Sequence, residues 1–276
     1  MTPTVSIVLP TYNRAAPLER AVKSIFSQSF KEWELIVVND ASTDGTNAFL
    51  DELAKKDARV RPVHNVKNNY PDISKNLNHG LSLARGKYVA RLDDDDHWCD
   101  DDKLKKQVAF LDEHPVYVVV GGGTIVVDAN DKERFRYFKP ETDEAIRARA
   151  LLANPFTHST VMFRRNAALA AGGYGSFNNA EDWDLWLRMG LHGKLYNFQE
   201  YFVRYLMNEE SKTFIFKRSQ SREILAVVAA HRKEYPHAVA ALVVACGQYC
   251  YNLLPLGLRR LLHNKLSRAK RTAFSG

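Results

Sequence analysis

The sequence predicts an α/β fold, in which helices flank a mainly parallel central sheet and a helical extension follows at the C-terminus. Two apolar runs near the start, residues 5–10 and 33–38, each lead into a polar turn and then into a stretch of helical character. A third apolar run, residues 89–92, ends in four consecutive aspartates. Alternation of buried strands with helices is typical of parallel sheets that are covered on both faces.

Polar side chains follow each of these predicted strands. The first strand ends at Pro10 and runs into Asn13 and Arg14, and the second strand leads to Asp40. Because ligands of open parallel sheets bind beyond the carboxyl ends of the strands, we expect these groups and the aspartates 93–96 to converge on one rim.

The four aspartates carry the strongest chemical signal in the chain. Side chains alternate between the two faces of an extended segment, so Asp93 and Asp95 are expected to share one face. Asp94 and Asp96 would then share the other face. Two unit charges of one sign repel by about 4 kcal/mol at 4 Å when the effective dielectric constant is near 20. Mg²⁺ typically binds one or two carboxylates together with substrate phosphates. The cluster therefore predicts a metal and diphosphate site, and a solvated acidic turn is the alternative.

Several short segments share a pattern with one enzyme family. They are Val5–Arg14, Val37–Thr46, Ala84–Tyr88, Leu92–Trp98, Lys103–Gln107, His158–Arg164, Gly172–Tyr174 and Glu181–Arg188. In this pattern the chain resembles the family 2 glycosyltransferases over about residues 4–206. The resemblance implies the GT-A fold, a nucleotide-sugar donor, and sugar transfer with inversion at the anomeric carbon.

The resemblance implies that the turn after the first strand lies under the nucleotide. The candidate donor-binding residues there are Pro10, Thr11, Tyr12 and Arg14. The alternative is an ordinary turn with Tyr12 packed in the core. Asp40 is expected to accept the imide N–H of a uracil, which favours a UDP-sugar, and a helix N-cap is its alternative role.

The resemblance also divides roles among the acidic residues. Asp93 would contact the ribose or a metal-bound water, and Asp95 would bind the metal directly, with Mg²⁺ or Mn²⁺ as the cofactor. Asp94 would support the donor side from the other face of the cluster. Lys75 is a candidate for contact with the donor phosphates, and a solvated helix face is the alternative for this residue.

Inverting transfer requires a base that takes the proton of the acceptor hydroxyl. Glu181 and Asp182 precede an amphipathic stretch and are expected at a helix N-terminus. The resemblance implies that Asp182 is the base and that Glu181 orients the acceptor or supports the loop. Helix capping is the alternative for the pair. His158 and Trp183 are candidates for the acceptor side.

The chain lacks the Gln-x-x-Arg-Trp sequence of processive members of the superfamily. We therefore expect a non-processive enzyme that adds one sugar to a glycan or lipid-linked acceptor in cell-envelope polysaccharide biosynthesis. A sugar-nucleotide pyrophosphorylase and a non-catalytic nucleotide- or glycan-binding relative are the alternatives. The triglycine 121–123 precedes a further β-rich stretch, so it indicates a bulge or a place where the backbone approaches a ligand, and not a dinucleotide fingerprint.

Length and composition fit one catalytic domain with an appendage. We expect a GT-A domain over residues 1–215, with a donor half over about 1–98 and an acceptor half over about 99–215, followed by an extension over 216–276. The three cysteines of the 276 residues argue for a reducing compartment, and the first residues lack the pattern of a signal peptide. A cytoplasmic location is expected, and the oligomeric state is left open.

The end of the chain is apolar and then basic. Residues 238–258 contain no charged side chain, and residues 258–268 alternate basic and apolar positions as an interfacial helix would. From residue 235 onward there are six basic and no acidic residues, which account for most of the net charge of +7. This distribution argues against a nucleic-acid-binding face on the catalytic part. It leaves open a peripheral contact with an anionic membrane, oligomer or core packing, and a membrane span.

Overall fold

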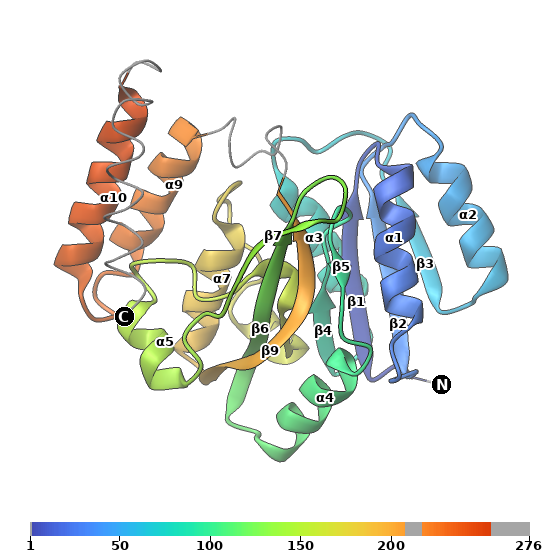
Figure 1. The fold of residues 1–276 in the computed structure, drawn as a ribbon, viewed down its shortest axis with the longest axis horizontal. Helices are drawn as coiled ribbons and strands as arrows, with labels where there is room; N and C mark the ends of the chain where they lie inside the picture. The colour runs from blue at the N-terminus through green and yellow to red at the C-terminus, as the bar shows by residue number, and fades with distance from the viewer. Residues whose placement is uncertain (1, 208–216, 255–276) are drawn as a thin grey trace.

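The computed structural model describes residues 2–207 and 217–254. Within these residues nine strands form one sheet, in the order β3-β2-β1-β4-β8-β6-β9-β5 with β7 paired to β6. Helices lie on both faces of the sheet (Figure 1). The elements of the first part are β1 (Val5–Thr11), α1 (Ala15–Phe26), β2 (Trp33–Asn39), α2 (Thr46–Lys56), β3 (Val60–His64), α3 (Ile73–Leu83), β4 (Tyr88–Arg91), β5 (His97–Trp98) and α4 (Lys103–Glu113).

The first part of the sheet is parallel, as predicted. Strand β1 pairs in parallel with β2 and with β4, and β2 pairs in parallel with β3. All residues of β1 and β2 are buried, which is the expected state of strands covered on both faces. The carboxyl ends of β1, β2 and β4 therefore meet at one rim of the sheet.

The second part of the sheet adds antiparallel pairs. Its elements are β6 (Tyr117–Val127), β7 (Glu133–Tyr137), α5 (Asp143–Arg149), the 3₁₀ helix η1 (His158–Thr160), β8 (Met162–Arg164), α6 (Arg165–Ala170), α7 (Glu181–Gly190) and β9 (Lys194–Leu206). Strand β8 lies antiparallel between β4 and β6. Because η1 immediately precedes β8, this pairing brings η1 to the end of β4, where the aspartates begin.

The triglycine lies inside β6, where the pairing with β9 changes register on both sides of Gly123. The extra residues lie on β9, where Asn197 to Val203 run beside Gly121 to Thr124. The predicted irregularity therefore occurs at the glycines, but the inserted residues belong to the partner strand. Aromatic rings approach the glycine backbones closely: a Cβ on Gly122 would lie 2.3 Å from a ring carbon of Phe202. Because glycine has no side chain, the ring of Phe202 packs directly against the backbone of β6.

Two helices, α9 (Lys217–Ala230) and α10 (Ala238–Leu253), form a pair beside α7 (Figure 1). An apolar cluster joins them to α7 and to the segment after α5. Its buried members are Ala150, Leu151, Ala180, Trp183, Leu187, Val227, Val228, Tyr235, Ala241 and Ala245. One face of α10 thus takes part in core packing. In the part of the chain that is described, no helix has both the length and the apolar character needed to cross a membrane.

Candidate functional site

The aspartates after β4 lie in a turn, and the predicted alternation of their side chains is wrong. The backbone N–H of Asp96 donates to the carbonyl of Asp93 at 3.2 Å, which bends the segment at Asp94 and Asp95. The bend pairs the carboxylates differently from an extended strand. Asp93 and Asp96 face Ser159, whereas Asp94 and Asp95 face Arg14.

Ser159 in η1 holds the first of these pairs. Its hydroxyl lies 2.5 Å from Asp96 Oδ2 and 3.3 Å from Asp93 Oδ2, and it accepts the backbone N–H of Asp93 at 3.1 Å. The backbone N–H of Leu206 donates to the other oxygen of Asp96 at 3.0 Å. Asp96 is therefore a buried structural carboxylate that ties the turn to η1 and to the end of β9.

Arg14 holds the second pair at the rim. Its guanidinium donates to Asp95 Oδ2 at 2.6 Å and lies 3.9 Å from Asp94 Oδ1. Both Arg14 and Asp95 remain partly exposed. The exit of β1 and the end of β4 thus meet, as the parallel order predicts.

Negative charge is crowded in this turn. Burial raises the pKa of Asp94 to about 7, and the neighbouring charge of Asp95 adds to the shift. Burial also raises the pKa of Asp95 and, together with the charges of Asp95 and Asp93, that of Asp96. Asp93 differs: although burial alone would raise it, the guanidinium of Arg91 holds the pKa of Asp93 below its usual value.

These groups fit a hard divalent cation that shares its coordination with a diphosphate. Asp95 offers a partly exposed carboxylate, and the carboxylate of Asp94 lies beside it in the same turn. In residues 2–207 and 217–254 no group of three or more His, Cys, Asp or Glu side chains is arranged to hold a metal ion by itself. A Mg²⁺ site built from one or two carboxylates and substrate phosphates does not need such a group.

The residues expected to bind the nucleotide flank the same rim. Pro10 and Thr11 are buried at the end of β1. Tyr12 is 46% exposed, so it does not pack in the core. Lys75 lies in the first turn of α3 with its ammonium 3.2 Å from Asp72, and it is largely exposed.

Asp40 is held by the loop between β3 and α3. Its Oδ1 accepts from Asn65 Nδ2 at 2.9 Å, and the backbone N–H of Asn69 donates to both of its oxygens at 3.0 and 3.1 Å. The side chain is 6% exposed. Each carboxylate oxygen has two lone pairs, so Asp40 keeps capacity for one further donor. Its contact with a base stays a prediction.

A buried chain of polar groups runs from Asp93 toward α7. Arg91 Nη2 donates to Asp93 Oδ1 at 2.6 Å, and Arg91 Nε donates to His158 Nε2 at 3.1 Å. The hydroxyl of Tyr174 lies 3.0 Å from the same nitrogen of His158. We assign the neutral tautomer with the proton on Nδ1 from this network. Burial and the charge of Arg91 lower the pKa of His158 to about 4.

Glu181 and Asp182 lie in the first turn of α7, as predicted. Asp182 Oδ1 accepts the backbone N–H of Trp183 at 2.7 Å, and Oδ2 accepts the side-chain amide of Asn154 at 2.8 Å. Burial and the charge of Asp182 raise the pKa of Glu181 well above its usual value. The site therefore favours the protonated form of Glu181.

Trp183 points away from these carboxylates into the cluster shared with α9 and α10. It is buried, and its indole N–H donates to the carbonyl of Ala150 at 2.7 Å. This position gives Trp183 a packing role, and its proposed contact with an acceptor stays a prediction. His158 likewise lies in the interior, between Arg91 and Tyr174.

Five residues of this region were not predicted from the sequence: Arg91, Lys139, Asn154, Ser159 and Tyr174. A signal existed for Arg91, because a charged residue inside an otherwise apolar strand needs buried partners. The others act through contacts with residues that are distant in the sequence, which no local pattern marks.

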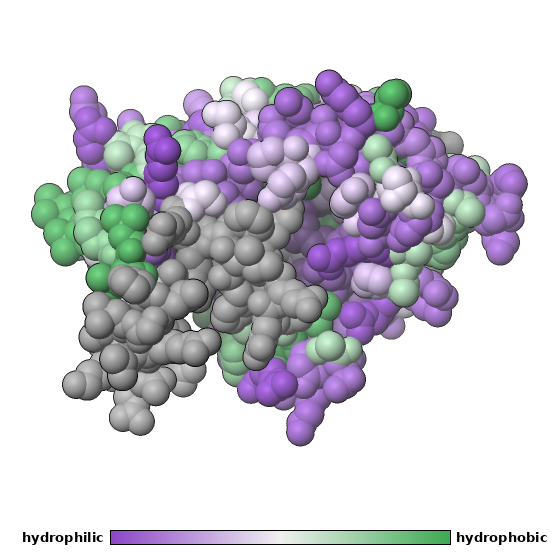
Figure 2. All heavy atoms as spheres, turned by 90° about the horizontal axis from the view of Figure 1, so that it is seen from above, coloured by the Kyte–Doolittle hydropathy of each residue, from purple (hydrophilic) through white to green (hydrophobic). Residues whose placement is uncertain are grey.

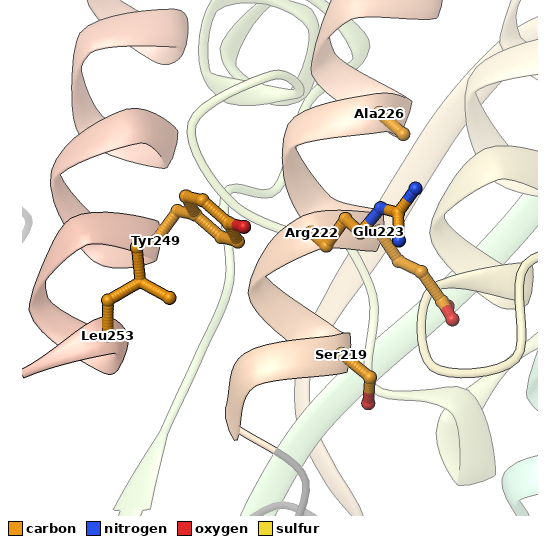
Figure 3. A pocket seen from close by; sticks show the side chains of 6 residues that line it. All are labelled: Ser219, Arg222, Glu223, Ala226, Tyr249 and Leu253. Atoms are coloured by element: carbon orange, nitrogen blue, oxygen red, sulfur yellow. The ribbon is translucent and has the colours of Figure 1, made fainter.

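A cavity of about 510 Å³ lies in the helical pair, apart from the aspartates. Its lining residues are Ser219, Arg222, Glu223, Ala226, Tyr249 and Leu253. Tyr249 points from α10 toward Arg222 on α9 (Figure 3). None of the residues predicted to bind donor or acceptor lines this cavity. One lining residue, Glu223, accepts the backbone N–H of Asn179 at 2.7 Å, and Asn179 precedes Glu181 by two residues.

Comparison with known proteins identifies the family of the chain. The family model described as glycosyl transferase family 2 matches residues 6–170. A putative glycosyltransferase of Bacillus subtilis, EpsE, is 38% identical over 85% of this chain and 84% of its own length. The amylovoran biosynthesis glycosyltransferase AmsE of Erwinia amylovora is 32% identical over 67% of this chain and 68% of its own length.

A solved structure shows the same fold. The mannosyltransferase PcManGT from Pyrobaculum calidifontis, in complex with GDP-Man and Mn²⁺, matches with a TM-score of 0.66 at 20% identity. The match covers 100% of this chain and 83% of that chain. The chain therefore has the GT-A fold and belongs to glycosyl transferase family 2.

Proposed function

We propose that this glycosyltransferase is an inverting, non-processive enzyme that moves one sugar from a nucleotide-sugar to a glycan or lipid-linked acceptor. One observation carries the proposal. Polar contacts lead from Asp93 at the acidic rim through Arg91 and His158 to Tyr174, and the charges of Asp182 and Glu181 on α7 act on Tyr174. The proposed donor site and base would thus lie at the two ends of this polar region.

In this proposal Asp182 is the general base. As the acceptor oxygen forms its bond to the anomeric carbon, the hydroxyl proton passes to the Asp182 carboxylate. The bond from that carbon to the diphosphate breaks, and its electron pair leaves with the nucleoside diphosphate. The reacting carbon passes through an oxocarbenium-like state, as in glycoside hydrolysis.

Arg14, Asp93, Asp94 and Asp95 would serve the donor. We propose Asp95 as the ligand of Mg²⁺ or Mn²⁺, which supplies positive charge to the leaving diphosphate when bound. The guanidinium of Arg14 lies 2.6 Å from Asp95. A diphosphate that binds beside Asp95 would therefore also lie beside this guanidinium. Asp93, held by Arg91, is proposed to contact the ribose.

The donor base is proposed to meet Asp40, and UDP is favoured. A carboxylate accepts the imide N–H of uracil, and it accepts the corresponding N–H of guanine equally well. Asp40 therefore does not by itself separate UDP-sugars from GDP-sugars, and the neighbouring loop must complete the choice.

The acceptor side is proposed to lie near a membrane surface. On α10 the exposed side chains are all small or apolar, and they include Val239, Val243 and Leu253. Figure 2 shows apolar side chains gathered at the left end of the molecule, where α10 lies. Six basic and no acidic residues occur from residue 235 onward. This combination suits an anionic bilayer, to which each Lys or Arg contributes about 1 kcal/mol.

A thermal-shift panel tests the donor site. UDP, GDP, dTDP and CDP are compared with and without Mn²⁺, on the wild type and on Asp95→Ala and Asp182→Asn variants. We expect one nucleotide to raise Tm in a metal-dependent way, with the shift lost in Asp95→Ala and kept in Asp182→Asn. Absence of any shift would favour the non-catalytic alternative.

Transfer assays test the base. Asp182→Asn keeps the shape of the side chain and is expected to lower kcat by about 100-fold or more. Transfer at the wild-type rate would show that another group takes the proton.

A further inference from the structure

The two oxygens of Asp182 are held by donors of different origin. Oδ1 accepts the N–H of Trp183, which belongs to the first turn of the same helix. Oδ2 accepts the side-chain amide of Asn154 at 2.8 Å. Asn154 lies 28 residues earlier, in the segment between α5 and η1. The second donor is therefore a product of the tertiary fold and not of helix geometry.

Asn154 is fixed in the orientation that this bond requires. Its Oδ1 accepts the backbone N–H of Phe156 at 3.2 Å, so its amide nitrogen must be the atom that faces Asp182. The ammonium of Lys139 donates to the backbone carbonyl of Asn154 at 2.6 Å. The loop after β7 thereby anchors the segment that carries Asn154.

Lys139 also contributes charge to this arrangement. Burial lowers the pKa of Lys139 to about 8, and the negative charge of Asp182 acts against that decrease. Among the described residues no carboxylate forms an ion pair with Lys139 within 4.0 Å. Asp182 is the acidic group whose charge Lys139 feels.

We propose that Asn154 and Lys139 are positioning residues for Asp182: Asn154 orients its carboxylate, and Lys139 anchors Asn154 and balances the carboxylate charge. This inference rests on the proposed role of Asp182 as base. With one lone pair of each oxygen engaged, the remaining lone pairs have fixed directions, and one of them is left to receive the acceptor proton. A carboxylate without Asn154 would rotate more freely and meet the acceptor hydroxyl less often in the reactive geometry.

Other titratable groups interact with the charge of Asp182 and contribute to the pH dependence of its ionisation. Glu181 comes from α7 itself, His158 from η1, and Tyr174 from the segment after α6. Lys139 comes from the loop after β7. An Asn154→Asp variant adds a carboxylate directly opposite Asp182, in place of a donor of the same shape.

The experiment compares Asn154→Ala, Asn154→Asp, Lys139→Met and Lys139→Arg with the wild type. We measure kcat and KM for donor and acceptor, and the pH profile of kcat/KM. We expect Asn154→Ala and Lys139→Met to lower kcat by about 10-fold or more, less than loss of the base itself, with donor KM within about twofold. Asn154→Asp should move the acid limb to higher pH, because like charges oppose ionisation. Lys139→Arg should recover part of the rate.

A matched control comes from Asn197, whose side-chain amide donates to the carbonyls of Pro140 and Pro155 at 2.9 and 3.1 Å. Asn197→Ala loosens the same two loops without touching Asp182. It is expected to lower Tm and to leave the pH profile in place. Folding of every variant is checked by Tm and by the donor-induced thermal shift.

Two results overturn the inference. One is a wild-type kcat in Asn154→Ala together with an unmoved acid limb in Asn154→Asp. The other is an Asn197→Ala variant that reproduces both effects. If Asp182→Asn is inactive while the Asn154 variants are unaffected, the proposed function stands and only this inference fails. If Asp182→Asn is fully active, both fail.

Discussion

His231 Nε2 lies 2.9 Å from Asp184 Oδ1, so the residue directly after α9 is joined to α7. Asp184 follows Asp182 by two residues, and its other oxygen accepts from Arg188 at 2.7 and 2.9 Å. Burial alone would raise the pKa of Asp184, but hydrogen bonds from His231 and Arg188 hold it below the usual value. His231 thus attaches the C-terminal helical pair to α7, the helix that carries the proposed base.

Replacing His231 by alanine should weaken this attachment. The change leaves a buried carboxylate with one hydrogen-bond donor fewer, which costs about 1–3 kcal/mol. We expect the free energy of unfolding in urea to fall by this amount. The exposed His192 at the end of α7 offers a control, since His192→Ala removes no buried partner. Equal stability of the two variants would contradict a structural role for the His231 contact.

The buried His158 predicts a specific pH dependence of stability. The folded protein holds its pKa near 4, below the ordinary 6.5. Between these values the unfolded chain binds a proton that the folded chain does not, so stability falls as pH decreases from about 6.5 to about 4. The shift corresponds to about 2–3 kcal/mol over this range.

Urea unfolding of the wild type and His158→Gln at several pH values between 7 and 4 measures this effect. The variant should show a shallower loss of stability toward acid. His79→Gln, at an exposed position of α3, should follow the wild type. Parallel curves for the wild type and His158→Gln would show that His158 titrates normally.

The sequence patterns predicted the parallel half of the fold because β1 and β2 are continuous buried runs. They also predicted that Arg14 and Asp95 lie at one rim, because neighbouring parallel strands end at the same edge of the sheet. The alternation of the aspartates was wrong, because a backbone hydrogen bond from Asp96 to Asp93 turns the segment. A period-two pattern applies only while the chain stays extended.

The contacts between residues that are distant in the sequence were less predictable for a different reason. Asn154 reaches Asp182, and Ser159 reaches Asp96, across 28 and 63 residues of sequence. Both residues are common in loops, and their local sequence gives them no distinctive pattern. Such contacts follow from the insertion of β8 between β4 and β6, which the periodicity of one strand does not specify.

The glycines of β6 supply a prediction about packing. A Cβ on Gly122 would lie 2.3 to 3.0 Å from three ring atoms of Phe202, which is fully buried. Gly122→Ala should therefore destabilise the protein by about 1–3 kcal/mol through overpacking. Gly45 provides the matched control, because a Cβ there meets no atom within 4 Å. Gly45 is the N-cap of α2, where alanine is disfavoured, and this loss offsets the gain from a less flexible unfolded chain, so Gly45→Ala should change stability by less than about 1 kcal/mol. Equal Tm values for the two variants would show that the Phe202 ring moves aside freely.

The apolar face of α10 leads to a prediction about membranes. Val239 and Val243 are 77% and 67% exposed, whereas Ala241 and Ala245 of the same helix are buried in the core. Removing the whole helix would uncover that core, so point substitutions test the surface more cleanly than truncation. Val239→Glu combined with Val243→Glu places negative charge on the proposed lipid contact and leaves the packed face intact.

We expect the wild type to sediment with vesicles that contain anionic lipid, and less with vesicles of neutral lipid alone. Added salt should weaken this binding, because it screens the basic residues near the end of the chain. The double glutamate variant should lose most of the binding. Val66→Glu, at a fully exposed valine in the loop after β3, should not. If the double variant instead binds vesicles normally but changes the molecular mass in solution, the face of α10 serves a second copy of the chain.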